Sequence, residues 1–316
     1  MRLKEWIKNF FLLSFLTLSS CNSESTFKEK APNIILIMAD DLGYETLGAN
    51  GGTSYKTPSL DRMAASGIRF NHCYSQPVCT PSRVKIMTGI NNVRNYIKFG
   101  HLDTGQTTFA HLLQGGDYTT SIIGKWQLGK SALGPQHFGF DEHCLWQVTE
   151  GRTNSLGRDT RYSGPVLQIN GFLQTFDTSD YGPDIVSQFG MKFMERAVDN
   201  DQLFFLYYPM MLTHCPFSPT PESEDWLVNQ DAVFTYRGDS NYFGDMVRYM
   251  DKIVGRLDEK LTELGIRDNT MIIFVGDNGT DQPIISNIGA ESVSGGKGQS
   301  TNAGTHVPLI LSLIHI

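Results

Sequence analysis

The stretch that decides the fold reads Asn33-Ile34-Ile35-Leu36-Ile37-Met38-Ala39 and is followed at once by Asp40-Asp41. A continuous apolar run without polar alternation is typical of a parallel strand that is buried on both faces. Similar runs predict strands at 119–123, 203–208, 271–275 and 307–311, and helical spacing predicts helices at 57–67, 107–113 and 241–264. Strands and helices in alternation predict an α/β fold with a mostly parallel central sheet and helices on both faces.

Polar residues stand where several of these strands end, namely Asp40-Asp41, Lys125, His214 and Asp277-Asn278. Parallel sheets form their ligand sites at the carboxyl ends of the strands. Carboxylates brought together there repel one another unless a cation lies among them, and hard oxygen ligands suit Ca²⁺ or Mg²⁺ rather than Zn²⁺. Taken alone, Asp40-Asp41 fits a solvated turn equally well, and the matching pair Asp277-Asn278 is what favours a metal site.

The most specific motif is Cys79-Thr80-Pro81-Ser82-Arg83. Pro81 and Ser82 fit the start of a helix that Gly89 ends, which puts Cys79 at a helix N-terminus, where the helix dipole favours negative charge. A lone cysteine is usually a small buried hydrophobic residue. A functional interpretation of Cys79 therefore depends on the motif as a whole.

This motif resembles the signature of the type I sulfatases of the alkaline phosphatase superfamily, in which the cysteine is converted to formylglycine. Other motifs resemble the same family in the same order, over roughly residues 33 to 311. They are Asp40-Asp41-Leu42-Gly43, Thr57-Pro58-x-Leu60-Asp61, Gly124-Lys125-Trp126-x-Leu128-Gly129, His214-x-Pro216-Phe217, Asp277-Asn278-Gly279 and Gly296-Lys297-Gly298.

The resemblance implies a sulfuric ester hydrolase with an alkaline phosphatase-like core. A hydrated formylglycine carries two hydroxyls on one carbon, and in the family one of them attacks sulfur while the other later helps to expel sulfate. It implies calcium, rather than magnesium, as a single ion bound by Asp40, Asp41, Asp277, Asn278 and the modified Cys79. It further implies that Arg83, Lys125 and Lys297 hold the sulfate oxygens and that His214 protonates the leaving oxygen.

The implied partners are a sulfated small molecule or polysaccharide as substrate and an enzyme that generates formylglycine. One residue departs from the family pattern: Gln127 stands where the family usually has a histidine that contacts the formylglycine hydroxyl. Glutamine forms hydrogen bonds but takes up no proton at neutral pH. Another group or water would then assist, or turnover would be slowed, or the protein would be impaired.

Two alternative functions stay open. The first is a phosphoester or phosphonate hydrolase of the same superfamily. Such relatives often bind two metal ions and need further histidine and aspartate ligands, and the sequence offers no histidine next to Asp277-Asn278. The second is a non-catalytic protein that binds sulfated glycans, which Gln127 motivates.

The N-terminus predicts export. A basic start and the apolar run Phe10–Leu18 are typical of a signal peptide, and the run is too short to span a bilayer. Leu18-Ser19-Ser20-Cys21 resembles a bacterial lipobox, which implies a lipid on Cys21, membrane attachment, and a periplasmic or outer-membrane lipoprotein; an ordinary signal peptide remains the alternative. Residues 22–32 would form a tether. Residues 33–316 would form the catalytic domain, truncated at the C-terminus, with the family's smaller C-terminal subdomain missing.

The composition is that of a globular protein, with 40% hydrophobic and 19% charged residues among 316 and a formal net charge of -7. No dense stripe of Lys and Arg interrupts this charge, which argues against nucleic acid as a partner. If Cys21 and Cys79 are modified, the pairing of Cys73, Cys144 and Cys215 stays open. The region 144–178 is expected to be an irregular insertion, whose Trp146, Arg152, Arg158 and Arg161 either contact a sugar or belong to a solvated loop.

Overall fold

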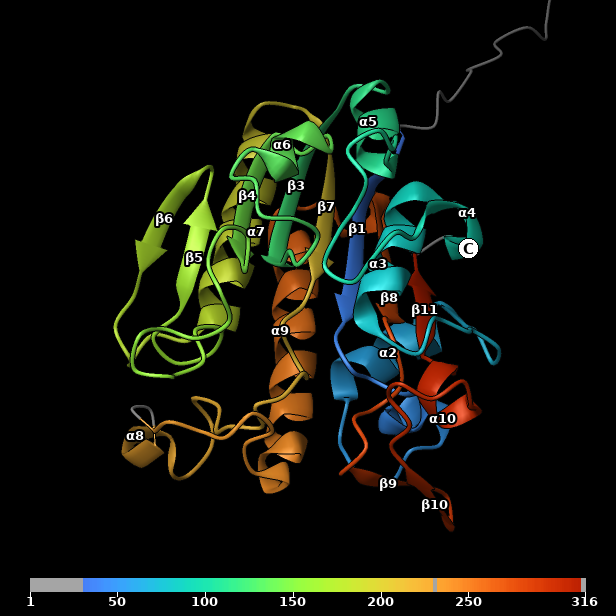
Figure 1. Cartoon of the computed structure of the whole chain (residues 1–316). Helices are drawn as coiled ribbons and strands as arrows, with labels where there is room; N and C mark the ends of the chain where they lie inside the picture. The colour runs from blue at the N-terminus through green and yellow to red at the C-terminus, as the bar shows by residue number, and fades with distance from the viewer. Residues whose placement is uncertain (1–30, 230–231, 314–316) are drawn as a thin grey trace, which may run out of the picture. The chain divides into compact units, whose positions relative to one another are not determined.

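The computed structural model describes residues 31–229 and 232–313, and its helices and strands belong to the unit Pro32–Ile316 (Figure 1). The strands are β1 Asn33–Ala39, β2 Ile68–Arg69, β3 Tyr118–Lys125, β4 Glu142–Trp146, β5 Val166–Ile169, β6 Phe172–Thr175, β7 Leu203–Pro209, β8 Thr270–Gly276, β9 Ile285–Ile288, β10 Glu291–Ser294 and β11 Leu309–Ser312. The α-helices are α2 Pro58–Ser66, α3 Cys79–Thr88, α4 Asn92–Asn95, α5 Phe109–Gln114, α6 Gly134–His137, α7 Gly182–Asp199, α8 Trp226–Asn229, α9 Phe243–Glu263 and α10 Asn302–Thr305. Short 3₁₀ turns are η1 Tyr44–Thr46, η2 Gly48–Asn50, η3 Ser240–Tyr242 and η4 Arg267–Asn269.

Within the described residues, one nine-stranded sheet has the order β2-β11-β8-β1-β7-β3-β4-β5-β6, and β9 and β10 form a separate hairpin. The five strands from β8 to β4 are parallel, and antiparallel pairs extend the sheet at both sides. The mostly parallel sheet predicted from the sequence is therefore confirmed. The carboxyl ends of the parallel strands all meet at the same edge.

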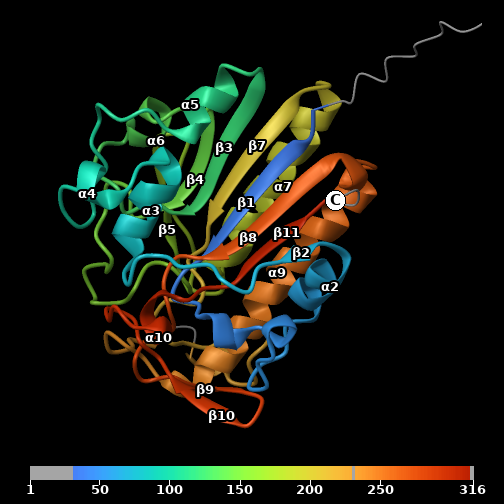
Figure 2. The ribbon, with the colours of Figure 1, turned by 90° about the vertical axis from the view of Figure 1, so that its right-hand side faces the viewer.

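Helices cover both faces of this sheet, with α2, α7 and α9 on one face and α3, α5 and α6 on the other (Figure 2). The side chains of β1 alternate between the two layers. Ile35 and Ile37 belong to the core beneath α7 and α9, whereas Leu36 and Met38 pack with residues of α3 and α5. This double burial is why the strand reads as an unbroken apolar run.

The helix α2 begins at Pro58, as predicted, but its cap comes from elsewhere in the chain. The side chain of Thr57 makes no capping hydrogen bond. Instead, the carboxylate of Asp251 on α9 accepts from the backbone N–H groups of Ser59 and Leu60, at 2.9 Å each. A buried carboxylate thus satisfies the free donors of the first turn and fixes α2 against α9.

The expectation that residues 144–178 form an irregular insertion is partly wrong. This range holds the end of β4 and the hairpin of β5 and β6, which pair in antiparallel register. Asn170 and Gly171 form the turn, with φ angles of 47° and 91°. An Asn-Gly pair between two short strands is a known hairpin signal, because both residues tolerate positive φ. All four residues of β6 are exposed, so the strand lacks the apolar run by which the others were recognised.

A buried histidine in β4 predicts how stability depends on pH. Burial lowers the pKa of His143 to about 4, and Nε2 of its ring accepts from the backbone N–H of Gly171 at 3.1 Å. The unfolded chain takes up this proton near pH 6.5, before the folded chain does. The contribution of the neutral ring is therefore complete above about pH 6.5 and decreases as the pH falls towards 4.

Urea unfolding in calcium-free buffer at pH 7.5, 6 and 5 measures this effect. We expect His143→Gln to flatten the decrease in the free energy of unfolding, with an upper limit of about 3 kcal/mol, since one pKa unit corresponds to about 1.4 kcal/mol. Equal decreases in the two proteins would contradict the assignment to His143.

The predicted signal peptide, the modification of Cys21 and most of the tether lie outside the described residues, so they stay predictions. Within residues 31–229 and 232–313, no helix has both the length and the apolar character needed to cross a membrane. The thiols of Cys73, Cys144 and Cys215 are free, so no pair among these three is bridged.

Candidate active site

The two acidic pairs leave the sheet side by side. In the parallel register of β1 and β8, Ala39 lies opposite Gly276, so both strands end at the same level. The backbone N–H of Asp41 donates to Oδ1 of Asp277 at 3.0 Å, and Nδ2 of Asn278 donates to Oδ1 of Asp41 at 2.8 Å. Asp40, Asp41, Asp277 and Asn278 are all fully buried.

Cys79 is the first residue of α3, as predicted, and its side chain is buried. Its thiol donates to Oε1 of Gln127 at 3.3 Å, and Nζ of Lys125 donates to its sulfur at 3.6 Å. Both partners come from the end of β3. The structure thus brings the predicted nucleophile, lysine and glutamine into direct contact.

A close backbone approach lets the end of β3 take this position. Gly124 has φ +103°, and a Cβ there would lie 2.1 Å from the carbonyl oxygen of Pro209 on β7. Gln127 also has a positive φ of 51°, which directs its side chain to Cys79 while Trp126 and Leu128 lie in the core. Glycine at 124 is therefore needed for the geometry of Lys125 and Gln127.

Each buried carboxylate has a cationic neighbour. Nζ of Lys125 lies 2.7 Å from Oδ2 of Asp40, and Nζ of Lys297 lies 2.5 Å from Oδ2 of Asp41. Nη2 of Arg83 lies 3.2 Å from Oδ2 of Asp277 and 3.6 Å from Oδ2 of Asp40. Three carboxylates and three cations therefore share one buried cluster, and the predicted residues Arg83, Lys125 and Lys297 all belong to it.

Burial and the neighbouring charges shift the pKa values of the three carboxyl groups in different directions. Burial alone would raise the pKa of Asp40, but Lys125 and Arg83 outweigh it and hold that pKa well below its usual range. Burial raises the pKa of Asp41, although Lys297 opposes this. Burial together with the charge of Asp40 raises the pKa of Asp277. Without a further cation, the cluster disfavours ionisation of all three carboxylates at once.

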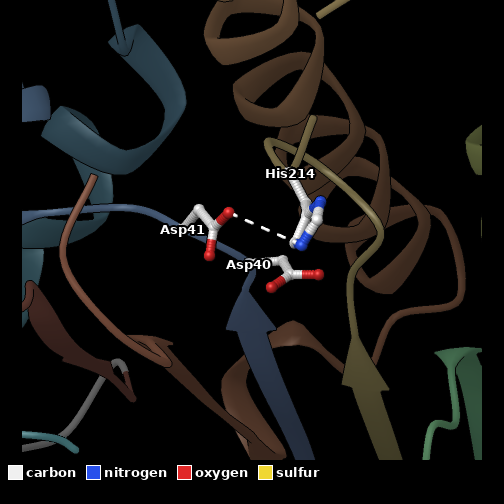
Figure 3. Close-up of side chains that lie close together, drawn as sticks. All are labelled: Asp40, Asp41 and His214. Carbon is white, nitrogen blue, oxygen red and sulfur yellow. Dashed lines mark ion pairs between the residues drawn. The ribbon is translucent and has the colours of Figure 1, made fainter. Parts of the chain in front are cut away.

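His214 faces the cluster from the segment that follows β7. Figure 3 shows its ring directed at the carboxylate of Asp41, with Nε2 3.7 Å from Oδ2. Burial lowers the pKa of His214 well below its usual value, although Asp40 opposes this. The neutral ring is therefore the favoured form in this cluster.

Nδ1 of His214 lies close to Arg161, a residue that the sequence suggested would either contact a sugar or lie in a solvated loop. Nη1 of Arg161 lies 2.9 Å from Nδ1 of His214, and the Arg161 guanidinium lies 4.2 Å above the ring of Trp146. Arg161 and Trp146 are both buried, so neither belongs to a solvated loop. They hold the His214 ring in place, and only tertiary structure reveals this contact. Arg152 pairs with Asp159 at 2.7 Å.

The donor set fits a hard divalent cation. Oδ1 of Asp40 and Oδ1 of Asn278 are buried and have no hydrogen-bond partner among the described residues. Single ligand atoms of Asp40, Asp41 and His214 lie within 4.8 Å of one another, and so do those of Asp40, Cys79 and Asp277. Oxygen donors predominate, which suits calcium or magnesium. Two unsatisfied oxygens are what such an ion would use.

Comparisons with known proteins point to one family. The family model described as Sulfatase matches residues 32–315. The chain is 32% identical over 292 residues to N-acetylgalactosamine-6-sulfatase of Sus scrofa, which covers 84% of this chain and 53% of that protein. It is 30% identical over 311 residues to arylsulfatase A of Homo sapiens, with 89% and 59% covered. The chain thus spans little more than half the length of these curated relatives.

Solved structures agree with the fold. The crystal structure of Ps i-CgsB superimposes with a TM-score of 0.75 at 27% identity and covers 90% of this chain and 66% of that chain. The same protein in complex with k-i-k-neocarrahexaose gives a TM-score of 0.74. The phosphonate monoester hydrolase of Agrobacterium radiobacter has a TM-score of 0.63 at 19% identity, a likeness of fold alone.

Proposed function

The chain belongs to the sulfatase family, and from this premise we propose that it hydrolyses sulfate esters, with Cys79 as the source of the nucleophile and one calcium ion in the acidic cluster. The observation that carries the proposal is the contact of Cys79 with Lys125 and Gln127 at the edge of three buried carboxylates. A hydrolase of sulfate esters needs a nucleophile beside positive charge, because the reacting group is an anion.

Asp40, Asp41, Asp277 and Asn278 would hold the calcium ion, which when bound supplies positive charge for the sulfate oxygens. The ion would take over the carboxylates that Lys125, Arg83 and Lys297 now neutralise. The three cationic side chains would then be available to a sulfate group beside residue 79. Their burial strengthens their interaction with the charge that develops there.

Cys79 would have to be oxidised to formylglycine by a maturation enzyme before it serves as the nucleophile. The position supports this role, because the residue opens α3 and lies next to Lys125. His214 faces the same acidic cluster, and its ring would donate a proton to the leaving oxygen after taking one up, a step that burial opposes and the negative charge of Asp40 favours. Arg161 keeps that ring oriented.

The substrate class that we propose is a sulfated carbohydrate. This rests on relatives: one is named N-acetylgalactosamine-6-sulfatase, and another was solved in complex with k-i-k-neocarrahexaose. Export and a lipid on Cys21 would place the chain in the bacterial periplasm or outer membrane, where polysaccharide fragments arrive. Both the location and the lipid are proposals that rest on the N-terminal sequence.

Release of sulfate tests the proposed activity. The protein would be produced with a formylglycine-generating enzyme and loaded with calcium, and 4-nitrophenyl sulfate and sulfated galactose oligosaccharides would be supplied in parallel with 4-nitrophenyl phosphate and a phosphonate monoester. We expect sulfate esters to be hydrolysed fastest. A phosphate or phosphonate ester hydrolysed faster would favour the alternative within the superfamily, and binding of sulfated sugar without any release would favour a non-catalytic role.

Gln127 gives a separate prediction about turnover. Its Oε1 accepts from residue 79 but takes up no proton, whereas a histidine there would serve as a general base. Such bases contribute roughly 10² to 10⁴ in rate. We expect Gln127→His to raise kcat about tenfold or more, with KM nearly unchanged.

Gln147 is a matched control for Gln127. It also has a positive φ, and its carbonyl oxygen accepts from the backbone N–H of Gln127. Among the described residues, no contact joins the side chain of Gln147 to Cys79. Gln147→His is expected to leave kcat unchanged. A kcat that does not respond to Gln127→His would mean that another group already performs this proton transfer.

A further inference from the structure

A second contact ties the two acidic loops together, a short distance away from the carboxylates themselves. Gly43 and Glu45 follow the pair Asp40-Asp41, and Thr280 follows Asp277-Asn278. The hydroxyl of Thr280 accepts from the backbone N–H of Gly43 at 3.0 Å and donates to Oε1 of Glu45 at 2.5 Å. One threonine hydroxyl thus joins the loop after β1 to the loop after β8.

This contact is buried. Thr280 is 1% exposed and Glu45 is 4% exposed. Burial raises the pKa of Glu45, although the hydrogen bond from Thr280 lowers it. In the part of the chain that the structure describes, no ion pair compensates Glu45. Burying a carboxyl group without a cation costs folding free energy, and the hydrogen bond from Thr280 offsets part of that cost.

Glycine at position 43 leaves room for the carboxylate of Glu45. A Cβ on Gly43 would lie 2.3 Å from Oε2 and 2.5 Å from Oε1 of Glu45. The φ of Gly43 is -75°, which any residue adopts, so a side chain at position 43 would act by displacing the Glu45 carboxylate and not through backbone strain. Gly43, Glu45 and Thr280 therefore fit together as one packed unit.

The other links between the loops differ in an important respect. The N–H of Asp41 donates to Oδ1 of Asp277, and Nδ2 of Asn278 donates to Oδ1 of Asp41. Both links use oxygens that an ion in the cluster would compete for. The hydrogen bonds of Thr280 use no oxygen of Asp40, Asp41, Asp277 or Asn278, so an ion bound by those four residues would not compete for them.

We propose that Glu45 and Thr280 are positioning residues that hold the two acidic loops at the spacing a calcium ion requires. The inference rests on the calcium site of the proposed function and adds residues that do not touch the ion. Groups that orient metal ligands from behind typically change metal affinity by about 10- to 100-fold when they are lost. We therefore expect Thr280→Val to weaken calcium binding by about that factor.

Isothermal titration calorimetry of the full chain with calcium chloride tests the proposal without any need for activity. Thr280→Ser keeps the hydroxyl and should bind calcium nearly as the wild type does. Thr270→Val is the matched control, because Thr270 is equally buried at the opposite end of β8 and its hydroxyl donates to the carbonyl of Ile266 at 2.7 Å. It should destabilise the fold without weakening calcium binding. Circular dichroism would establish that each variant is folded.

Glu45→Ala provides an independent arm. Because Glu45 and Thr280 act through one hydrogen bond, the double variant should bind calcium no more weakly than Thr280→Val alone. Wild-type affinity in Thr280→Val, an equal loss in Thr270→Val, or additive losses in the double variant would each overturn the positioning role. A wild-type chain that takes up no calcium would instead contradict the proposed calcium site, and the positioning role with it.

Discussion

Replacing Cys79 by alanine is expected to lower kcat/KM for 4-nitrophenyl sulfate by at least about 10⁴-fold, as loss of the nucleophile does in other hydrolases with covalent catalysis. Cys79 is the side chain that both Lys125 and Gln127 contact, so its replacement removes the group that these two residues position. Cys79→Ser should be nearly as inactive. Serine carries one hydroxyl on its β-carbon, whereas a hydrated aldehyde carries two.

The matched control for this prediction is Cys73→Ala. Cys73 is a half-buried free cysteine that precedes the same helix, and in the described residues its thiol has no contact with the acidic cluster. This variant should keep the activity of the wild type. Comparable activity in Cys79→Ala and wild-type protein would contradict the role of Cys79, because the observed hydrolysis would then not depend on residue 79.

Replacing Asp277 by asparagine is expected to weaken calcium binding by more than about 100-fold, beyond the range found when residues outside the ligand shell are changed. The wild-type cluster matches three carboxylates with Arg83, Lys125 and Lys297. Asparagine removes the negative charge that Asp277 would supply on ionising beside the ion, so a divalent cation would enter a more positive site. Burial and Asp40 already raise the pKa of Asp277, so a neutral side chain of the same shape should be tolerated by the calcium-free fold.

Thermal unfolding with and without calcium measures both halves of this prediction. Free calcium at 100 times its Kd should stabilise the wild type by about 2.7 kcal/mol, and the same concentration should stabilise Asp277→Asn by less than about 0.4 kcal/mol. Asp281→Asn is the control, since it removes the same charge from the same buried loop, where Oδ1 of Asp281 lies 3.8 Å from Arg237. It should respond to calcium as the wild type does. A calcium response retained in Asp277→Asn would exclude this carboxylate as a ligand.

The sequence predicted four of the five parallel strands, β1, β3, β7 and β8, and the residues at their carboxyl ends, because strands buried on both faces read as unbroken apolar runs. It missed the fifth, β4, in which Glu142 and His143 precede the apolar residues. It did not predict α7, although Pro183 lies in the first turn and Val186, Gly190, Phe193 and Ala197 follow a helical spacing. It also missed the hairpin of β5 and β6. Glutamine interrupts both strands, and the exposed β6 lacks the pattern by which buried strands are recognised.

The site was predicted to a greater extent, since the predicted side chains do lie together. The contacts that sequence patterns did not reveal join residues far apart in the chain. Arg161 reaches His214 across 53 positions, and Thr280 reaches Glu45 across 235. Neither pair belongs to a motif with fixed spacing, so the two contacts are seen only in the folded structure. Trp146 and Arg161 illustrate the same limit, because a loop rich in polar residues gave no sign of their burial.

The most direct test of the proposed nucleophile is a mass spectrum of the peptide that contains Cys79, from protein purified out of its native host. We predict that cysteine at this position is replaced by formylglycine, a loss of about 18 Da relative to the unmodified thiol, as expected when the thiol is oxidised to an aldehyde. Unmodified Cys79 in folded native protein would contradict the proposed nucleophile, and with it the proposal that this chain hydrolyses sulfate esters in the manner of its family.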